Sequence, residues 1–398
     1  MRHFKILTAV ILACLTLIAG CVKAPQEGNG ASNNSAATSG GGRQSRNPNS
    51  PIKIGFSMDT LKEERWQRDK EYVTARAKEL GAEVKIEVAN GDDHLQIDQA
   101  ENLLTQGIDV LMIAPHNGEV AASIVDAAKR QNVPVITYDR LVRNSDVDLY
   151  ISYQAVKVGE MQAKYCLDHA PKGNYVVVGG SSADNNAILY HQGQMNILKP
   201  VVDRGDIKIV ADQYAKEWKA SEALNIVENA LTQTGNNVVA VVAANDGTAG
   251  GAVQALEEQK LTGKVFVSGQ DAELAACQRI VEGKQSMTVY KPIKPLADVA
   301  VESAVKLARG EKVESKETIN NGKKDVPSIL LEPIAVDKNN MVETVIKDNY
   351  QKLEDVYANV PKDQWPKQQQ QSQNAESEKP NALSRVVYAA FYMLLMLF

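Results

Sequence analysis

Side chains that can hold a neutral polyol stand where several predicted strands of this chain end. Adjacent hydroxyls of a polyol each donate and accept hydrogen bonds, so planar two-pronged groups such as those of Asp, Asn and Arg can hold a pair of them. Side chains of these types follow several of the predicted strands. The segments concerned are 64–69, 139–140, 181–186, 245–247 and 270–271, together with Lys291.

Two of the three tryptophans add an apolar surface to these polar segments. The strand pattern places Trp66 and Trp218 in loops that follow predicted strands. The face of an indole ring can cover the apolar C–H surface of a pyranose ring. Polar strand ends and two tryptophans together indicate a sugar as the ligand.

Each of these residues also has a purely structural interpretation. Three of them fit helix N-caps, where a side-chain oxygen accepts hydrogen bonds from the first turn. These three are Asn245, Asp246 and Asp271. Arg140 and Lys291 fit solvated surface charges, and Trp66 fits an aromatic position in a core. Gly179-Gly180 fits a tight turn better than a phosphate cradle, because no Lys-Ser/Thr pair follows it.

The strands and helices that must position these residues form two series. Short β-branched runs alternate with amphipathic stretches, which predicts βαβ units and parallel sheets. The first series has strands at 52–58, 83–88, 110–114 and 133–138 and helices at 61–80, 95–106 and 120–131. The second series has strands at 175–178, 207–210, 238–243 and 265–268 and helices at 158–169, 188–202, 220–234, 250–259 and 274–281.

A further strand, helix and strand follow the second series, at 287–290, 293–309 and 328–336. A strand-helix unit after a finished domain predicts a return to the first domain. Connections near 149–154, 287–291 and 330–335 would then all cross between the domains. The expected fold class is therefore α/β, with two doubly wound parallel-sheet (Rossmann-like) lobes joined by a three-strand hinge. A ligand is expected in the cleft at the carboxyl ends of the strands.

The composition is that of a soluble globular protein, with 44% hydrophobic and 23% charged residues. The net charge of −5 gives no electrostatic reason to expect a nucleic-acid partner. Five histidines without ligand spacing predict no metal site. The strand ends offer no nucleophile with a base and no nucleotide loop, so we expect neither catalytic residues nor a cofactor. Cys166 and Cys277, both in predicted helices, are expected to be buried small hydrophobes.

An export signal precedes these elements. A basic start and an apolar run over 6–17 lead into Leu17-Ile18-Ala19-Gly20-Cys21, with small residues at the cut site. A cysteine directly after Ala-Gly resembles the bacterial lipobox, in which the thiol receives a diacylglycerol. The alternative is a membrane anchor, but the apolar run is shorter than the roughly 20 residues that span a bilayer. We expect a signal peptide over 1–20, then a lipidated Cys21 and a flexible linker over 21–51.

The body from residue 52 to about residue 350 resembles the D-xylose-binding proteins of bacterial ABC transport systems, within the ribose/galactose-type periplasmic binding family. The resemblance covers nearly the whole domain pair. It is carried by Glu64-Arg65-Trp66-Gln67, Tyr138-Asp139-Arg140, Tyr150-Ile151-Ser152, Asp184-Asn185-Asn186-Ala187, Gly193-Gln194-Met195, Asn245-Asp246, Ser268-Gly269-Gln270-Asp271 and the segments 287–293, 320–322 and 325–328.

The resemblance implies a type I periplasmic binding protein fold and a set of sugar contacts. The polar sugar contacts of the family correspond to Arg65, Asp139, Arg140, Asn186, Asn245, Asp271 and Lys291 in this chain. The aromatic residues that stack on the sugar correspond to Trp66 and Trp218. The chain departs from the family pattern at Tyr214, close to Trp218, and at Gly247, which we expect to loosen the loop beside Asn245. These departures leave the relative affinity for glucose or another aldose open.

The implied function is capture of D-xylose between two closing lobes and its delivery to an ABC transporter permease. Alternatives are a receptor for another aldose, such as glucose or ribose, or a sugar-sensing partner of a chemoreceptor or histidine kinase. We expect an extracytoplasmic monomer, lipid-anchored to the cell membrane, with an N-terminal lobe of 52–153 plus 290–330 and a C-terminal lobe of 154–289 plus 331–360. The remaining 361–398 form a polar tail with a short apolar end.

Overall fold

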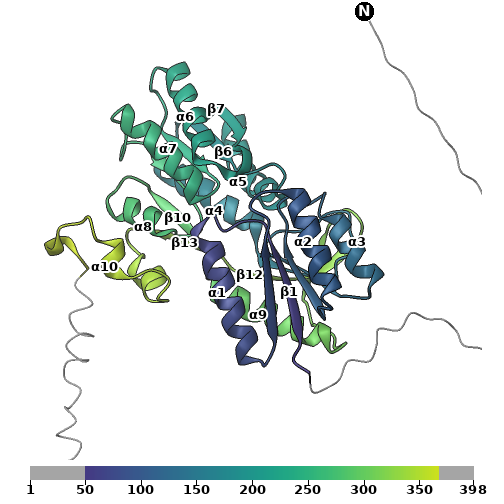
Figure 1. Cartoon of the computed structure of the whole chain (residues 1–398). Coiled ribbons are helices and arrows are strands. Elements are labelled where there is room, and N and C mark those ends of the chain that lie inside the picture. The colour runs from purple at the N-terminus through teal and green to yellow at the C-terminus, as the bar shows by residue number, and fades with distance from the viewer. Residues whose placement is uncertain (1–49, 367–398) are drawn as a thin grey trace, which may run out of the picture. The chain divides into compact units, whose positions relative to one another are not determined.

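Strands and helices alternate along the chain and build two largely parallel sheets (Figure 1). The computed structural model describes residues 50–366. The predicted signal peptide, Cys21, most of the predicted linker and the apolar end of the tail lie outside the described residues. No helix within 50–366 is long and apolar enough to cross a membrane.

The first sheet has seven strands in the order β11-β12-β5-β4-β3-β1-β2, and we call it with its helices the first lobe. All neighbouring strands pair in parallel except β11 and β12. The strands are β1 (Lys53–Met58), β2 (Glu83–Val88), β3 (Val110–Ala114), β4 (Val135–Tyr138), β5 (Leu149–Tyr153), β11 (Glu317–Asn320) and β12 (Asp325–Leu331). The helices are α1 (Glu64–Glu79), α2 (Asp93–Thr105), α3 (Ala122–Arg130) and α9 (Ile293–Ala308).

Both faces of this sheet are covered by helices, which is why its central strands are continuous apolar runs rather than alternating ones. Ile54, Phe56 and Met112 pack with α1 and α9 on one face. Leu111 and Ile113 pack with α2 and α3 on the other. The packing of α9 beside α1 returns the chain to the first lobe after the second sheet is complete.

The second sheet has four parallel strands in the order β7-β6-β8-β9, and we call it with its helices the second lobe. Its strands are β6 (Gly173–Gly179), β7 (Ile207–Tyr214), β8 (Ala240–Ala243) and β9 (Phe266–Val267). Its helices are α4 (Ala155–His169), α5 (Asn185–Asp203), α6 (Ala220–Thr234), α7 (Asp246–Glu258) and α8 (Leu274–Val281).

Helices α4 and α5 approach each other so closely that glycine is required at their contact. A Cβ on Gly159 would lie 1.9 Å from the carbonyl oxygen of Tyr190, and a Cβ on Gly193 would lie 1.9 Å from that of Val156. Such distances are far inside van der Waals contact. The two glycines therefore fix the position of α5, whose first turns carry polar residues of the cleft.

Three connections run between the two lobes. They lead from β5 into α4, from β10 (Met287–Tyr290) into α9, and from β12 into β13 (Ile334–Asp337). Strands β10 and β13 pair antiparallel as a separate two-stranded sheet. The connections lie side by side, since the amide of Gln154 donates to the carbonyl of Leu331 at 3.0 Å and the Tyr153 hydroxyl donates to the carbonyl of Pro292.

The predicted single strand at 328–336 is wrong, because the chain divides it into β12 and β13, which belong to different sheets. Glu332 and Pro333 lie between them, and proline has no amide hydrogen to continue a ladder. Segment 149–153, expected only as a connection, is the strand β5, which lies between β12 and β4 inside the first sheet. Strand β11 was not predicted; it pairs with β12 as a hairpin at the sheet edge.

The last described segments pack against α8 and β10. They are the π-helical turn η2 (Val342–Ile346), α10 (Leu353–Val356) and the 3-10 turn η3 (Lys362–Gln364). Their apolar residues form a separate cluster with Cys277, Ile280 and Tyr290. Figure 1 shows this C-terminal part beside α8.

Candidate functional site

The strand orders bring the carboxyl ends of both sheets to one cleft. In the first sheet the order reverses between β1 and β3, and in the second sheet it reverses between β6 and β8. A doubly wound sheet opens a crevice at such a switch point, outside the carboxyl ends of its strands. The loops that follow these strands therefore line the space between the two lobes.

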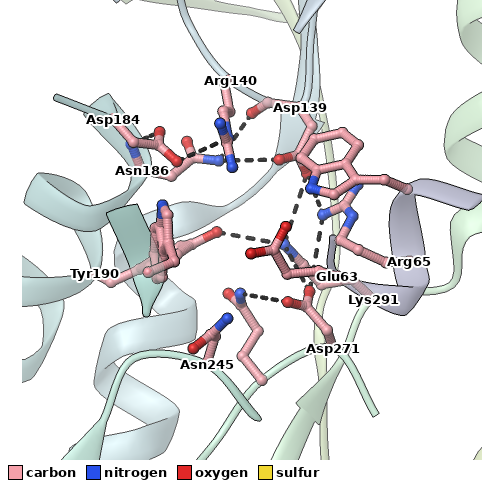
Figure 2. A pocket seen from close by; sticks show the side chains of 13 residues that line it. Glu63, Arg65, Asp139, Arg140, Asp184, Asn186, Tyr190, Asn245, Asp271 and Lys291 are labelled. Atoms are coloured by element: carbon pink, nitrogen blue, oxygen red, sulfur yellow. Dashed lines mark hydrogen bonds and ion pairs between the residues drawn. The ribbon is translucent and has the colours of Figure 1, made fainter. Parts of the chain in front are cut away.

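A cavity of about 290 Å³ occupies this space, and all nine predicted sugar contacts line it (Figure 2). Four further residues line it as well. The predicted residues are Arg65, Trp66, Asp139, Arg140, Asn186, Trp218, Asn245, Asp271 and Lys291, and the additional ones are Glu63, Asp184, Tyr190 and Gln270. We call this space the inner cavity.

Arg65 stands at the first turn of α1 and is held by carboxylates on two sides. Its Nη1 donates to Oδ1 of Asp139 at 2.7 Å, and its Nε donates to Oδ2 of Asp69 at 3.1 Å. Asp69 lies one helical turn further along α1 and also accepts from the buried hydroxyl of Tyr138. The guanidinium is thus fixed in place before any ligand arrives, which lowers the entropic cost of binding.

Asp139 follows β4 in a left-handed conformation, with a φ of 61°. Burial alone would raise the pKa of its carboxyl, but Arg65, Lys291 and Arg140 outweigh burial and lower it to about 2. Its backbone carbonyl accepts from the Ser152 hydroxyl at 2.6 Å. Asp139 is therefore an ionised acceptor held rigidly by side chain and backbone alike.

Arg140 connects the two lobes. Its Nη1 donates to Oδ2 of Asp59 at 2.6 Å in the first lobe, and its Nε lies 2.8 Å from Oδ2 of Asp184 in the second lobe. Burial disfavours the guanidinium charge, but Asp184 and Asp59 outweigh it and raise the pKa of Arg140. Asp184 is also the N-cap of α5 and accepts from the Asn186 amide at 2.9 Å.

Asn186 makes a second contact across the cleft. Its Nδ2 donates to the carbonyl oxygen of Asp139 at 3.0 Å and to Oδ2 of the same residue at 3.2 Å. Its Oδ1 accepts from the Tyr150 hydroxyl at 3.4 Å. Contacts from α5 to the loop after β4 show that the two lobes touch across the cavity.

Asp271 and Lys291 form the third side of the inner cavity. Lys291 Nζ lies 3.2 Å from Oδ1 of Asp271 and 3.6 Å from Oδ1 of Asp139. Lys291 also donates to the Tyr190 hydroxyl at 3.3 Å. The lysine is 3% exposed, so its interpretation as a solvated surface charge is wrong. Arg140, 5% exposed, is not a surface charge either.

The N-cap interpretation holds for one of the three candidates. Asn245 caps α7, with its Oδ1 accepting from the Thr248 amide at 2.9 Å, and it also lines the inner cavity. Since Oδ1 is used by the cap, Nδ2 is the group that Asn245 can offer to a ligand. Asp246 is the first residue of α7 and lies away from the cavity lining. Asp271 has a φ of 97° and precedes the cap residue Glu273 of α8.

The two tryptophans line the inner cavity from different lobes. Trp66 belongs to the first turn of α1, so its expected place in a loop is wrong. The guanidinium carbons of two arginines lie over its ring, that of Arg65 at 4.4 Å and that of Arg140 at 5.1 Å from the ring centroid. Trp218 ends the short 3-10 turn η1 (Lys216–Trp218) after β7.

Gly247 lies inside α7, so the expected loosening of a loop at this position is also wrong.

The Trp218 ring rests on the backbone at the end of β6. A Cβ on Gly180 would lie 2.1 Å from Cη2 and Cζ3 of Trp218, so only glycine leaves room for the indole. Gly179 leaves room for a different ring, because a Cβ there would lie 2.8 Å from Cδ1 of Tyr214. The Trp218 ring, packed on Gly180, meets Tyr190 edge-on at 6.4 Å between centroids.

Three buried polar atoms of the inner cavity have neither a hydrogen-bond partner nor an ion-pair partner among the described residues. One is a donor, Nε1 of Trp218, and the others are acceptors, Oε2 of Glu63 and Oε1 of Gln270. Leaving a buried polar group without a partner costs about 1–3 kcal/mol. A ligand with several hydroxyls, each able to donate and accept, would satisfy both kinds of atom.

The sequence carries a partial indication that residues beyond the nine predicted contacts would line the inner cavity. Tyr190 follows Asn186 by four residues on α5, so both lie on one helical face. Glu63 immediately precedes α1, and Gln270 immediately precedes Asp271. Among residues 50–366, no group of three or more His, Cys, Asp or Glu side chains could hold a metal ion. The inner cavity combines paired charges, amides and aromatic rings, which suits recognition of a small neutral polyol.

The chain is similar to known proteins over most of its length. The sequence model of a family described as "Periplasmic binding protein domain" matches residues 54–312. The D-xylose-binding periplasmic protein of Haemophilus influenzae is 54% identical over 306 residues, covering 77% of this chain and 92% of that protein. The D-xylose-binding periplasmic protein of Escherichia coli is 52% identical over 301 residues, covering 76% and 91%.

The structure of this chain is also similar to a solved protein structure. It is a carbohydrate transporter solute-binding protein from Chloroflexus aurantiacus in complex with D-glucose. It superposes with a TM-score of 0.74 at 32% sequence identity and covers 77% of this chain and 98% of that one. The similarity therefore extends over both lobes.

Proposed function

The chain belongs to the periplasmic binding proteins, and from this premise we propose that it captures D-xylose outside the cytoplasm and delivers it to the permease of an ABC transporter. High-identity relatives are D-xylose-binding periplasmic proteins. The observation that carries the proposal is the inner cavity itself. It spans about 290 Å³ between two lobes, a volume that includes some open solvent, and presents one donor and two acceptors that lack partners.

Capture follows from the placement of these groups on both lobes. Arg65, Trp66 and Asp139 belong to the first lobe, while Asn186 and Trp218 belong to the second. A sugar touches both sets only when the lobes are closed, so its binding shifts the open–closed equilibrium toward the closed form. The three side-by-side connections are the segments about which this movement would occur.

The crowded lining of the inner cavity supports a pentose. Its walls are charged and bulky side chains that are almost wholly buried, and Tyr190 and Trp218 pack against one another at its edge. Xylose has no exocyclic CH₂OH group, whereas glucose must find room for one. We therefore favour xylose over glucose, with glucose or ribose as the alternative ligand of the same cavity.

The proposal describes a binding protein without catalysis. The residues that line the inner cavity include no Ser, Thr, Cys or His that could act as a nucleophile or a proton shuttle. Its central carboxylates, Asp139 and Asp271, lie within 4 Å of the basic groups of Arg65 and Lys291. Paired charges of this kind hold a neutral ligand in place.

Attachment to the membrane through a lipid on Cys21 is the second part of the proposal. It rests on the Leu-Ile-Ala-Gly-Cys sequence at 17–21 and on the polar linker after it. A linker of about 30 residues has an r.m.s. reach on the order of 30 Å. That reach would let a tethered monomer meet its permease, or a chemoreceptor or histidine kinase in the sensing alternative.

Calorimetry of the mature protein against xylose, glucose, ribose and arabinose tests the function. We expect saturable one-to-one binding with xylose tightest. A clear preference for glucose or ribose would overturn the xylose assignment and leave a sugar receptor. Absence of saturable binding with every aldose would overturn the receptor function itself.

A further inference from the structure

A second cavity lies between the lobes beside the inner one. It has a volume of about 470 Å³ and takes eight of its lining residues from the first lobe and four from the second. Glu63, Arg140 and Trp218 line both cavities, so these three side chains lie between the two spaces. We call the second space the outer cavity.

The outer cavity is the side of the cleft that opens to solvent. Lys62, Asn90, Gly91 and Lys219, all of which line it, are exposed residues, whereas every residue that lines the inner cavity is buried. A ligand held in the inner cavity could therefore extend toward the outer cavity past the shared side chains. A substituent on the enclosed sugar would then lie in the outer cavity.

The charged side chains around the outer cavity contact one another. Asp59 lies 2.6 Å from Nη1 of Arg140 and 2.9 Å from Nδ1 of His116. Lys62 Nζ lies 3.1 Å from Oε1 of Glu63 and donates to the carbonyl of Glu217 at 2.8 Å. Lys219 Nζ lies 2.7 Å from Oε2 of Glu217. The neutral residues that remain can donate or accept: they are Thr60, Asn90 and Ser181. Such a surface suits a neutral polar group better than an ion.

Two atoms of the shared wall lack partners. Nε1 of Trp218 and Oε2 of Glu63 are buried without a hydrogen bond within the protein. One can donate and the other can accept. A hydroxyl or a glycosidic oxygen beside this wall would come within reach of these atoms, and each hydrogen bond formed there would offset the cost of leaving a buried polar atom without a partner.

The loop that carries Trp218 is strained, which is a separate indication of a ligand clamp. Glu217 and Trp218 have φ angles of 53° and 57°, in the left-handed region that ordinary side chains disfavour. Backbone conformations of this kind are unfavourable and cluster at binding sites. Here the strain orients a side chain that lines both cavities.

We propose that the outer cavity binds a second sugar ring, joined to the ring held in the inner cavity, so that the protein takes a short oligosaccharide or glycoside of xylose as well as the free sugar. The inference rests on the proposed function, because it places the first ring in the inner cavity. The second ring would contact both lobes, as the first does, and would also favour the closed form.

Xylobiose is the probe for this proposal. Its two rings are both xylose units, so either can enter the inner cavity, and one compound samples substituents at both ends of the sugar. Calorimetry with the full-length mature protein is expected to show one-to-one binding of xylobiose that is competitive with xylose. The two sugars are titrated separately and then in competition.

A variant that fills the outer cavity separates its role from that of the inner one. Ser181 lines the outer cavity and not the inner one, so Ser181→Tyr is expected to weaken xylobiose binding at least about tenfold and to change xylose affinity by less than about twofold. Ser182→Tyr is the matched control, since the adjacent serine is exposed and lines neither cavity. It should change neither affinity.

The other possible results distinguish failure of the second site from failure of the proposed function. Xylose binding without xylobiose binding would overturn the second site and leave the proposed function standing. Xylobiose binding that Ser181→Tyr leaves unchanged, or weakens only as much as xylose binding, would also overturn it. Failure of both sugars to bind the unmodified protein would overturn the proposed function, and the second site with it.

Discussion

Arg140 of the first lobe forms an ion pair with Asp184 of the second lobe, with 2.8 Å between Nε and Oδ2 and both side chains almost wholly buried. The same guanidinium donates to Asp59 on its own lobe. Arg140 is therefore held in position whether the lobes are open or closed, while its bond to Asp184 exists only when they meet. Closure thus forms a charged contact of its own, in addition to those made by the sugar.

Removal of this contact is expected to weaken xylose binding. Asp184→Asn deletes the carboxylate charge, and a hydrogen bond to a charged group contributes on the order of 1.5–3 kcal/mol, so affinity should fall about ten- to hundredfold. Asp203→Asn, which removes an exposed carboxylate from the same helix, is the control. Unchanged affinity in Asp184→Asn, measured by calorimetry, would show that the pair does not contribute to closure.

Asp271 is expected to accept hydrogen bonds from the sugar. Its carboxylate lines the inner cavity beside Lys291, and Asp271→Ala removes this acceptor, so xylose affinity should fall about ten- to hundredfold by the same free-energy scale. Asp168→Ala, an exposed carboxylate on α4, should have no effect. Normal affinity in a correctly folded Asp271→Ala protein, checked by circular dichroism, would remove Asp271 from the site.

The two cavity tryptophans should each contribute strongly. Truncation of a buried aromatic anchor commonly costs 2 kcal/mol or more, so Trp66→Ala or Trp218→Ala should weaken xylose binding at least about thirtyfold. Trp365, which packs on Tyr357 and lies outside the inner cavity, supplies the control Trp365→Ala.

Tryptophan fluorescence offers an independent measurement of the same contacts. In a Trp365→Phe background the signal comes from Trp66 and Trp218 alone, since the chain has three tryptophans. Addition of xylose should change the intensity or wavelength of this signal. A saturable calorimetric titration without any fluorescence change would contradict stacking of the sugar on these rings.

A buried carboxyl outside the inner cavity should make stability depend on pH. Burial, aided by Asp271, raises the pKa of Asp246 from 3.8 to about 7 against the opposing effect of Arg279. Burial and the neighbouring Asp246 likewise raise the pKa of Glu273 to about 8. The native state therefore binds protons more tightly than the unfolded state, and the free energy of unfolding should fall as pH rises from about 4 through 7.

Urea unfolding at pH 5 and pH 8 measures this effect. The loss of stability between the two pH values should be on the order of a few kcal/mol in the native sequence, and Asp246→Asn should reduce it clearly. Asp203→Asn should leave it unchanged. An equal loss in native and Asp246→Asn proteins would show that Asp246 is ionised throughout this range.

The lipid attachment is tested at Cys21. Cys21→Ala should release the protein from membranes or leave its signal uncut, because the thiol that would carry the lipid is gone. Cys14→Ala lies within the apolar run of the signal and should behave as the native protein. A fully processed Cys21→Ala protein that still fractionates with membranes would place the anchor elsewhere.

Much of the fold was predictable because the central strands are buried on both faces. Runs such as 110–114 are wholly apolar and end sharply at turn residues, so β3 was placed correctly. The hairpin of β11 and β12 was missed because β11, at the sheet edge, has mostly exposed side chains and shows no apolar run. The division of 328–336 depends on which sheet each half joins, and a local pattern does not contain that information.

The site was predictable where recognition residues immediately follow strands. Asp139 and Arg140 directly follow β4, and Asn245 stands two residues after β8. Glu63 and Tyr190 were missed for different reasons. Glu63 lies in an acidic stretch typical of a helix start, and Tyr190 lies inside α5, where only the path of that helix across the cleft reveals its role.

The seat of Trp218 on Gly180 limits how this protein could be redesigned for another ligand. Any side chain at 180 would occupy the space of the indole, so it can be accommodated only if 218 becomes smaller at the same time. A library that varies the residue at position 218 and keeps glycine at position 180 presents flat side chains of different area to the ligand. A library that varies 180 alone returns misfolded or inactive receptors, so positions 180 and 218 must be treated as a single unit of selection.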